Sequence, residues 1–370
     1  MTRVCCFCER WESGGIESFL HNVLLRLDLT QLQVDVVCAS LGESIFIKPL
    51  QDRGIQFFEL SGSQRKVKES HRRFQTLMAE RRWDVLHVNA FQGLSLAYLR
   101  LAKNAGIPVR IAHSHNTALR KSLTRPLKLA IHAWAKDKYT KDATDLWACS
   151  KAAAEFLFSS TELARRGFQF IPNGIDTARF RFDPAARETV RAELGLTGAF
   201  VIGNVGRLCY QKNQTFLLDV FSEVLKQRPE SRLLLVGEGE DKPALQEKAR
   251  RLGIAEKVIF YGVTDRVEHL LWAMDVFAFP SLFEGLGIVA IEAQAAGLPV
   301  VCSEHVPPEA DLSSLFQSVP LSAGSERWAN TLLDTPKQVT DGTQTVYDAG
   351  FDIFHTAKQL ESCYLRSDVS

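Results

Sequence analysis

Short apolar runs alternate along this chain with longer segments in which apolar residues recur every three to four positions. The short runs predict buried strands, and the longer segments predict amphipathic helices. In the first half, strands are expected at residues 4–8, 34–39, 56–59, 84–89, 109–113, 146–149 and 169–172, and helices at 17–27, 45–53 and 151–158. In the second half, strands are expected at residues 200–205, 232–236, 258–261, 276–279 and 300–302, and helices at 213–227, 242–252, 266–273, 287–296 and 347–365.

Regular alternation of strands and helices is typical of α/β proteins with parallel sheets covered on both faces. Because the pattern runs twice, two Rossmann-like, doubly wound domains are expected, residues 1–172 and 173–346, facing a central cleft. The join falls at Pro172-Asn173-Gly174, where proline and Asn-Gly interrupt regular structure. A final helical segment, 347–370, is expected to pack back on the first domain. Ligands should lie at the carboxyl ends of the strands.

The composition is that of a globular protein: of 370 residues, 46% are hydrophobic and 24% charged. No apolar run reaches the ~18 residues of a membrane-spanning helix, and the first residues are too short for a signal peptide. A cytoplasmic protein is therefore expected. The net charge of +1 conceals +9 over residues 1–180 and −8 over the rest. The basic half should meet an anionic partner.

Eight cysteines lie mostly in strand-like segments. Residues 5–8 contain a C-x-x-C spacing, which a zinc or redox site could use, but no second pair accompanies it. Buried, reduced thiols are the favoured interpretation, and no metal site is expected.

The segment from Phe279 to Ala293 places Glu284 on a loop after a strand and Glu292 inside the following helix. Gly285 and Gly287 would let the backbone approach a ligand, and the helix N-terminus offers free N–H groups. Such a site suits a diphosphate, with the two carboxylates accepting hydrogen bonds from sugar hydroxyls. Alternatively, the glycines only form a tight turn and Glu292 is solvated, although its neighbours are apolar.

A second group of residues follows the first strand of the second half. Arg207 and Lys212 bracket a loop that leads into a helix near Asn213. Two cations at a strand's carboxyl end fit a diphosphate, because they can neutralise the negative charge of a leaving group. The plainer alternative is a pair of surface cations.

Together these segments resemble the retaining glycosyltransferases of the GT-B fold that carry an E-x7-E motif, family 4 or group 1. The resemblance extends over residues 3–365 and is most specific at 275–303. Further segments match in the family's order: Gly14-Gly15-Ile16-Glu17, Ile171-Pro172-Asn173-Gly174-Ile175-Asp176, Val236-Gly237-Glu238-Gly239 and Phe260-Tyr261-Gly262-Val263.

The resemblance implies a role for each matching residue. Arg207 and Lys212 would contact the donor diphosphate, Glu284 the donor sugar and Glu292 the ribose hydroxyls. The other donor-binding candidates are Gly14, Gly15, Gly237, Gly262, Val263, Gly285, Leu286 and Gly287, with Asn173 and Glu238 as possible additions. The family retains anomeric configuration without an obligatory metal, so no cofactor is expected.

A histidine at the end of an N-domain strand faces the transferred sugar in this family. Ala112-His113-Ser114-His115-Asn116 offers two. The His115-Asn116 dipeptide matches the family's pattern and favours His115 as the catalytic histidine. The spacing from Pro108 leaves His113 open.

Two basic segments, 65–82 and 120–141, could face an anionic inner membrane surface. The second has seven Lys or Arg residues and one acidic residue, interleaved with Leu127, Trp134 and Tyr139. A basic amphipathic helix with Trp and Tyr suits a headgroup interface. The alternative is a solvated helix with a buried Trp134. Nucleic acid is not expected as a partner, because no nucleic-acid-binding module is present.

The expected protein is thus a retaining, hexosyltransferase-type enzyme that moves a sugar from a UDP- or GDP-sugar to a glycan acceptor. The acceptor is expected to be polyprenyl-linked, in polysaccharide, capsule or exopolysaccharide synthesis, with the enzyme peripheral on the inner face of the plasma membrane. Two alternatives are a GT-B sugar-nucleotide epimerase and a non-catalytic sugar-nucleotide-binding protein.

Overall fold

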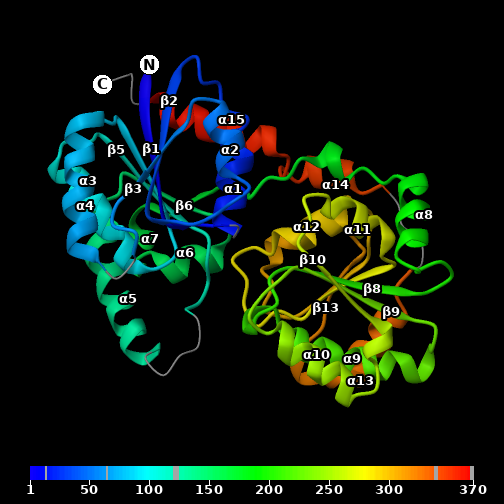
Figure 1. Ribbon diagram of the computed structural model, residues 1–370. Coiled ribbons are helices and arrows are strands. Elements are labelled where there is room, and N and C mark those ends of the chain that lie inside the picture. Colours follow the sequence, from blue (N-terminus) through cyan, green and yellow to red (C-terminus); the bar gives the residue numbers. More distant parts are fainter. Residues whose placement is uncertain (13–14, 64–65, 120–124, 337–340, 367–370) are drawn as a thin grey trace. The chain divides into compact units, whose positions relative to one another are not determined.

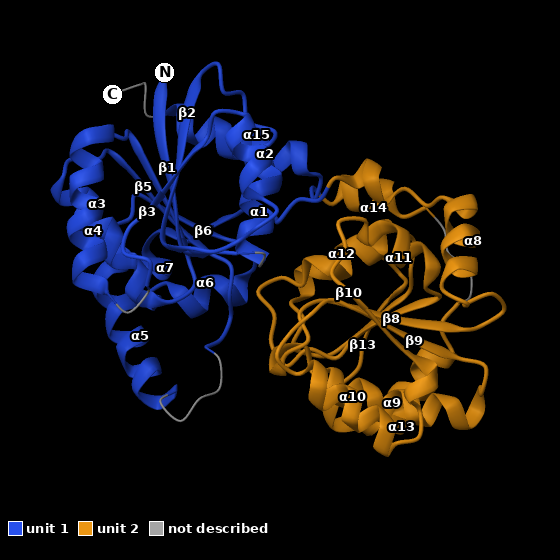
Figure 2. Ribbon diagram, in the orientation of Figure 1, with its two compact units in different colours: residues 1–175, 350–370 blue, residues 176–349 orange. Residues whose placement is uncertain are grey.

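The chain forms two compact units (Figure 2): unit 1, residues 1–175 and 350–370, and unit 2, residues 176–349. The computed structural model describes residues 1–12, 15–63, 66–119, 125–336 and 341–366. Each unit is a parallel sheet with helices on both faces (Figure 1). The α/β architecture expected from the alternating pattern is therefore confirmed.

Unit 1 contains a seven-stranded sheet, among its described residues, in the order β3-β2-β1-β4-β5-β6-β7. Its strands are β1 (Thr2–Trp11), β2 (Leu32–Leu41), β3 (Gln56–Glu59), β4 (Val85–Ala90), β5 (Val109–Ser114), β6 (Asp145–Ala148) and β7 (Gln169–Phe170). Its helices are α1 (Gly15–Leu24), α2 (Ile47–Asp52), α3 (Val67–Arg81), α4 (Ala97–Asn104), α5 (Arg125–Tyr139), α6 (Lys151–Leu157), α7 (Ser160–Arg166) and α15 (Ile353–Leu365), with short 3-10 turns η1 (Gly93–Leu96) and η2 (Thr140–Asp142).

Alternate side chains of β1 enter different hydrophobic layers, because successive residues of a strand point to opposite faces. Cys6 belongs to the layer formed with α1, α2 and α15, and its Sγ lies 4.0 Å from the Tyr364 hydroxyl. Phe7 faces the opposite layer, where its ring centroid lies 6.1 Å from that of Phe74 on α3 and 4.0 Å from that of Tyr98 on α4. Burial raises the pKa of the Cys6 thiol to about 12.

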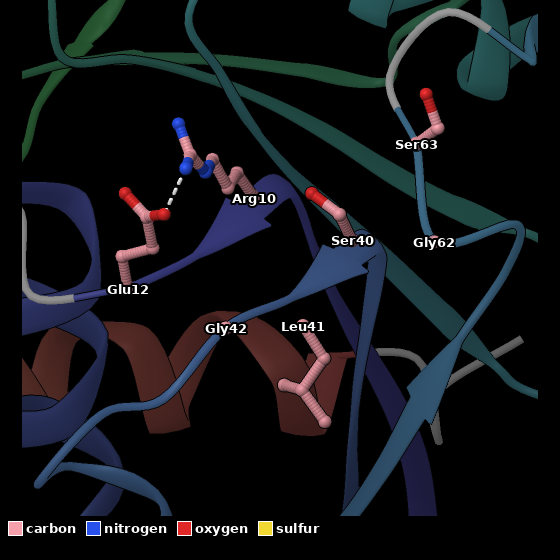
Figure 3. Close-up of a pocket in the computed structure, with 7 residues that line it drawn as sticks. All are labelled: Arg10, Glu12, Ser40, Leu41, Gly42, Gly62 and Ser63. Atoms are coloured by element: carbon pink, nitrogen blue, oxygen red, sulfur yellow. Dashed lines mark ion pairs between the residues drawn. The ribbon is translucent and has the colours of Figure 1, made fainter.

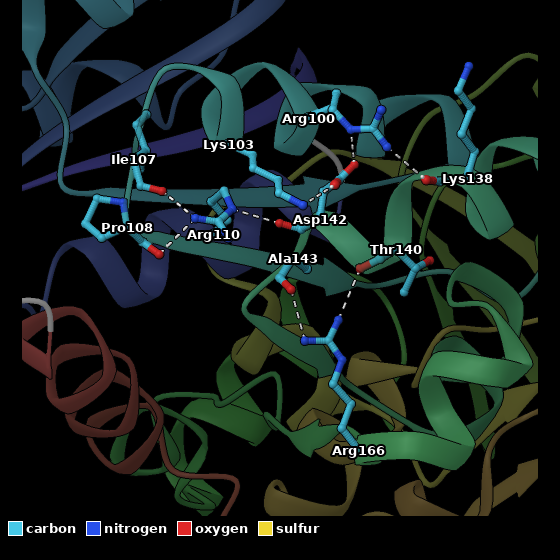
Figure 4. Close-up of polar contacts among 10 residues, drawn as sticks. All are labelled: Arg100, Lys103, Ile107, Pro108, Arg110, Lys138, Thr140, Asp142, Ala143 and Arg166. Atoms are coloured by element: carbon cyan, nitrogen blue, oxygen red, sulfur yellow. Dashed lines mark hydrogen bonds and ion pairs between the residues drawn. The ribbon is translucent and has the colours of Figure 1, made fainter.

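A buried carboxylate neutralises part of the positive charge of unit 1 through ion pairs (Figure 4). Asp142, 1% exposed, pairs with Arg100 and with Lys103, whose Nζ lies 3.2 Å from Asp142 Oδ1. Arg110 Nε donates to the Asp142 carbonyl at 2.8 Å. Arg100 and Lys103 lie on α4 and Arg110 lies in β5, so these contacts hold η2, which precedes β6, against α4 and β5. The basic excess of this half is therefore partly structural.

Unit 2 contains a six-stranded sheet, among its described residues, in the order β10-β9-β8-β11-β12-β13. Its strands are β8 (Val201–Val205), β9 (Arg232–Val236), β10 (Val258–Gly262), β11 (Val276–Phe279), β12 (Val300–Cys302) and β13 (Phe316–Ser318). Its helices are α8 (Pro184–Glu193), α9 (Gln214–Gln227), α10 (Lys242–Arg251), α11 (Val267–Ala273), α12 (Ile288–Ala295), α13 (Gly324–Leu333) and α14 (Thr343–Asp348), with 3-10 turns η3 (Thr177–Phe180), η4 (Tyr210–Lys212), η5 (Ala255–Lys257), η6 (Pro308–Ala310) and η7 (Leu321–Ala323).

The single helix expected at 347–365 is wrong. The chain forms α14 and α15 instead, separated at Gly350, whose φ of +83° does not fit a right-handed helix. Asp352 then starts α15, because its side chain accepts the Phe354 N–H at 2.9 Å. Backbone bonds from Ile175 N to the Phe351 carbonyl and from Ile353 N to the Ile175 carbonyl, both 2.8 Å, join the returning segment to unit 1.

Candidate functional site

The strand order of unit 2 reverses between β8 and β11, and the chemically distinctive residues follow these two strands. Arg207 and Lys212 lie after β8, and Glu284 lies after β11. In open parallel sheets the carboxyl ends of strands at such a reversal form the usual ligand site. These two groups of residues lie about 70 positions apart in the chain. The fold therefore brings them together at one edge of the sheet.

Lys212 and Glu284 form a largely buried ion pair at this edge. Lys212 Nζ lies 2.8 Å from Glu284 Oε1, and their side chains are 16% and 7% exposed. Gln211 Nε2 donates to the Phe283 carbonyl at 3.0 Å and to Glu284 Oε2 at 3.4 Å. The ammonium also lies 4.8 Å from the centroid of the Phe279 ring. These contacts fix a cation and a carboxylate side by side with little exposure to water.

Arg207 lies differently. Its Nε donates to Glu240 Oε2 at 3.0 Å, and its side chain is 62% exposed. Exposed pairs of this kind hold together weakly in water. The guanidinium can therefore exchange Glu240 for an incoming anion, whereas the Lys212 ammonium is already fixed in place.

The loops after β8, β9 and β10 interlock through glycines. Gly237, at φ +132°, approaches so closely that a Cβ there would lie 2.2 Å from the Gly206 carbonyl oxygen. Gly237 N also donates to the Gly262 carbonyl at 2.8 Å. Next to this contact, Glu238 pairs with Lys242 at 2.5 Å, and Val263 is 70% exposed. The loops after β8, β9 and β10 thus contact one another next to Arg207.

The second glutamate lies in α12, as the sequence predicted. The helix begins after Gly287, whose φ is +84°. A Cβ added to Gly287 would lie 3.0 Å from the Phe279 ring, and the preceding Leu286 is 2% exposed. Burial raises the pKa of Glu292 to about 7; Arg179 and Lys212 lower it, and Glu268 raises it. Lys212 therefore acts electrostatically on both Glu284 and Glu292.

In unit 1, the two candidate histidines lie in a group of packed rings at the end of β5. His113 is fully buried, and its Nδ1 lies 3.0 Å from His87 Nε2. His115 is partly exposed, its ring centroid is 4.0 Å from that of His113, and its Nε2 lies 2.9 Å from Asn89 Oδ1. The more accessible ring is thus that of His115.

The Pro172-Asn173-Gly174 segment fits closely against α15. A Cβ on Gly174 would lie 2.6 Å from the Thr356 hydroxyl, so this glycine serves packing. Asn173 is partly exposed, yet its Oδ1 is buried without a hydrogen bond from any residue that the structure describes. Its side chain lies near enough to His115 to act on the pKa of that ring.

The amino-terminal glycine loop can be placed only in part. Gly15 begins α1, whereas Gly14 lies outside the described residues. Nearby, a pocket of about 330 Å³ opens at the carboxyl ends of β1 and β2 (Figure 3). It is lined by Arg10, Glu12, Ser40, Leu41, Gly42, Gly62 and Ser63, and Arg10 forms an ion pair with Glu12. Apart from Leu41, the lining consists of polar residues and glycines.

Three contributors were missed by reasoning from the sequence. Gln211, which bonds Glu284, lies inside the segment already selected, so its position between Arg207 and Lys212 was a usable signal. Asn89 ends a strand that was expected, but nothing in the sequence linked it to His115. Arg179 reaches the surroundings of Glu292 through its pair with Glu268, Nε to Oε2 at 2.8 Å, a contact that only the fold creates.

The site's chemistry is that of an anion and hydroxyl binder: cations, carboxylates and backbone glycines. Within the part of the chain that the structure describes, no three His, Cys, Asp or Glu side chains gather as metal ligands. Likewise, none of the described helices has the length and apolar character needed to cross a bilayer.

Comparison with known families agrees with this chemistry. Residues 186–314 match the model of glycosyl transferases group 1, and residues 13–179 match that of glycosyltransferase family 4. The two matches together span most of the chain, which therefore belongs to the group 1/family 4 glycosyltransferases.

Proteins similar to this chain are also named as glycosyltransferases. EpsF of Bacillus subtilis, named as a glycosyltransferase, is 29% identical over 334 residues, 86% of this chain and 84% of that protein. An Escherichia coli UDP-Gal:alpha-D-GlcNAc-diphosphoundecaprenol alpha-1,3-galactosyltransferase is 27% identical over 233 residues, 61% of this chain and 59% of that protein. A Mycolicibacterium smegmatis GDP-mannose-dependent phosphatidylinositol monomannoside mannosyltransferase is 32% identical over 54% of this chain and 53% of its own.

Solved structures show the fold. Anabaena Alr3699/HepE in complex with UDP-glucose superposes with a TM-score of 0.79 at 20% identity, over 99% of this chain and 100% of that one. WaaG, described as a glycosyltransferase involved in lipopolysaccharide biosynthesis, gives 0.71 at 17% identity, over 99% of each. The chain thus has the two-domain GT-B fold.

Proposed function

We propose that this glycosyltransferase transfers a sugar from a UDP- or GDP-sugar to a hydroxyl of a glycan acceptor, with retention of anomeric configuration. The observation that carries the proposal is the ion pair between Lys212 Nζ and Glu284 Oε1, which is 2.8 Å long and largely buried where the strand order of unit 2 reverses. A carboxylate for a sugar hydroxyl and a cation for a diphosphate oxygen are then held at neighbouring positions.

The reaction creates a negative charge that the cations can stabilise. The bond from the sugar C1 to the β-phosphate oxygen breaks, and a bond from C1 to the acceptor oxygen forms on the same face. The acceptor's proton passes to the departing diphosphate. Arg207 and Lys212 stabilise that diphosphate, and a preorganised charge in a dry site does so more effectively than one in water. No cofactor is needed in this scheme.

The other candidate residues bind parts of the nucleotide-sugar donor. Glu284 binds the transferred sugar, Glu292 the ribose hydroxyls, and the backbone of residues 285–287 the phosphates. Gly237 and Gly262 shape the rim for the nucleotide, with Glu238 and Val263 beside it. The candidates in unit 1 are Gly14, Gly15 and the two histidines, with His115 as the favoured ring because it is the more exposed.

We also propose that the acceptor is a polyprenyl-linked glycan and that the setting is polysaccharide synthesis, of the exopolysaccharide or capsule type. Support comes from relatives whose names include a diphosphoundecaprenol or a phosphatidylinositol acceptor.

Such an acceptor requires a protein that reaches the inner membrane surface, and α5 has suitable chemistry. Leu127 is 63% exposed and Trp134 is 52% exposed, so the alternative in which Trp134 is buried is wrong. Lys128 and Lys138 are exposed on the same helix, and Lys138 Nζ lies 4.3 Å from the centroid of the Trp134 ring. Apolar and cationic side chains together favour anionic lipid.

The second basic segment supports this more weakly. On α3, Lys68, Arg72 and Arg73 are exposed, whereas Arg81 is held by the buried Asp35, Nε to Oδ2 at 2.9 Å. Residues 64–65 and 120–124, which add further cations to the two segments, lie outside the described residues.

The deciding experiment measures nucleoside-diphosphate release from a panel of UDP- and GDP-sugars, with and without bacterial lipid extract. Release from one donor that rises with lipid supports transfer to a lipid-linked acceptor. The C1–H1 coupling of the NMR spectrum of the product gives its anomeric configuration, and inversion would contradict the retaining mechanism.

Two other outcomes select the alternatives. Conversion of a UDP-sugar to its epimer without diphosphate transfer to an acceptor would indicate an epimerase. Donor binding measured by calorimetry, with no turnover under any condition, would indicate a binding protein. Failure of every donor to bind would overturn the assignment of the site.

A further inference from the structure

The partly buried contact between Asn89 and His115 lies beside the point where the sheet of unit 1 is most suited to hold a ligand. The strand order of this sheet reverses between β1 and β4. Asn89 is near the carboxyl end of β4, and His115 follows the adjacent strand β5. Their side chains meet at 2.9 Å, Asn89 Oδ1 to His115 Nε2. Asn89 is fully buried, whereas His115 is partly exposed.

The orientation of the Asn89 amide follows from its other neighbours. Its Nδ2 faces two backbone carbonyls, those of Phe7 and His87, each at 3.5 Å. Turning the amide over would place Oδ1 against these oxygens and lose both contacts, because a carbonyl cannot donate. Oδ1 therefore points at the histidine and accepts a hydrogen bond from it.

This orientation determines which nitrogen of His115 carries the proton. Since Asn89 Oδ1 can only accept, Nε2 must be the donor, and a neutral ring then has a bare lone pair on Nδ1. Burial lowers the pKa of His115 to about 3, with the Asn173 side chain opposing the shift, so the ring is neutral at physiological pH.

His115 Nδ1 is buried and receives no hydrogen bond from the residues that the structure describes. The same is true of two neighbouring atoms, His113 Nε2 and Asn173 Oδ1. Unsatisfied buried polar atoms are rare in folded proteins, and their clustering indicates a place for a ligand or ordered water.

We propose that Asn89 is a positioning residue that holds His115 in its Nε2–H form, so that Nδ1 accepts a hydrogen bond from a substrate hydroxyl. The inference rests on the proposed function for the identity of that hydroxyl, which belongs to a sugar. It goes beyond that function by assigning the tautomer and the residue that imposes it.

The groups around His115 are consistent with a neutral ring. Asn89 faces it from β4, His113 from β5, Phe19 from α1 with ring centroids 5.0 Å apart, and Asn173 from the segment after β7. None of these four is an anion that would stabilise an imidazolium. Burial lowers the pKa of His113 well below its ordinary value, so that ring is neutral as well.

The first test reads the tautomer directly, without any substrate. Two-bond ¹H–¹⁵N correlation spectra of the uniformly labelled full chain distinguish an Nε2–H from an Nδ1–H histidine, and a His115→Gln sample assigns the signal. The expected result for His115 is Nε2–H in wild type. An Nδ1–H ring in wild type overturns the proposal, whether or not a donor is ever found.

The second test uses two substitutions of Asn89 that differ in charge. Asn89→Leu removes the acceptor, and kcat for sugar transfer should fall at least ~10-fold, with the donor KM changed much less. Asn89→Asp keeps the acceptor and adds a negative charge, which raises the pKa of a neighbouring histidine by about 1–3 units. The acid limb of its kcat–pH profile should therefore shift upward by that amount.

The matched control is Asn104→Asp, an exposed asparagine on α4 that adds the same charge to the same unit. It should reproduce the wild-type profile. If Asn89→Asp also matches wild type at every pH, or if Asn89→Leu keeps wild-type kcat, the positioning role is wrong. If either variant fails to fold, the spectra of wild type still decide.

Discussion

Lys212 and Glu284 are 72 positions apart in the sequence, yet Nζ and Oε1 lie 2.8 Å apart. The two residues follow β8 and β11, adjacent strands at the point where the sheet order reverses. The pair also lies near Glu292, whose pKa the Lys212 ammonium lowers against the effect of burial. One cation thus contacts Glu284 directly and acts electrostatically on Glu292.

Removing either member of this pair should disable turnover while the fold persists. Lys212→Met and Glu284→Gln are each expected to lower kcat by ~10²–10³, because each removes a preorganised group at the reacting centre. The double variant should lose about as much as one single variant, since groups acting as a unit are not additive. Steady-state kinetics with the identified donor, and circular dichroism for the fold, check this.

The control for that series is Lys226→Met, which removes an exposed cation paired with Glu223 on α9. It should leave kcat unchanged. Near-wild-type activity in Lys212→Met or Glu284→Gln would show that the chemistry lies elsewhere.

Glu292 should make stability depend on pH in a specific window. Its pKa is raised from 4.5 to about 7 in the folded state. Between these values the folded chain holds a proton that the unfolded chain has released, so the free energy of unfolding falls as pH rises through the window. The loss should approach ~3 kcal/mol above pH 7. Urea unfolding at pH 4.5 and 8 measures it.

The Glu292→Gln variant isolates this contribution, because the other titrating groups remain. The difference in unfolding free energy between variant and wild type should grow in the variant's favour from pH 4.5 to 8. A difference that stays constant across this range would contradict the raised pKa.

The close approach of Gly237 to Gly206 should not tolerate a side chain. Gly237→Ala is expected to cost about 1–3 kcal/mol in unfolding free energy, since its Cβ would collide with the Gly206 carbonyl 2.2 Å away. Displacing this loop should also weaken binding of UDP or GDP, measured by calorimetry. Gly253→Ala is the matched control: its φ is also positive, +70°, but nothing lies within 4 Å of the added Cβ. Equal losses in the two variants would refute the collision.

Removing charge from α5 should weaken membrane binding if this helix contacts lipid. Each cation near an anionic surface contributes about 1 kcal/mol, so Lys128→Gln with Lys138→Gln should lower the partition coefficient ~30-fold. Sedimentation with vesicles containing phosphatidylglycerol measures this, and neutral phosphatidylcholine vesicles should show little binding by either protein.

Two further variants complete that experiment. Leu127→Ser with Trp134→Ser should weaken binding to the same vesicles, because both side chains are exposed and apolar. Lys226→Gln with Arg250→Gln removes two exposed cations from unit 2 and serves as control. Binding by the α5 variants as strong as that of wild type would eliminate this helix as the contact.

The sequence by itself determined the succession of elements, because hydrophobic periodicity is a local property. The strand expected at residues 276–279 coincides with β11, and the turn residues around Gly287 mark where α12 begins. The order of the motifs was enough to name the family. Local signals failed where long-range contacts decide: the helix expected at 347–365 is broken because residues 351–353 bond to Ile175 in another part of the chain.

Only the tertiary structure decided which side chains meet. Strand order is set by how the sheet buries its faces, and it joins Lys212 to Glu284 and Asn89 to His115 across tens of residues. The pKa of Glu292 is raised by desolvation, which depends on the atoms packed around a group and not on its neighbours in the sequence. Residue types therefore indicated the kind of chemistry, while packing determined which side chains meet and how burial shifts their pKa values.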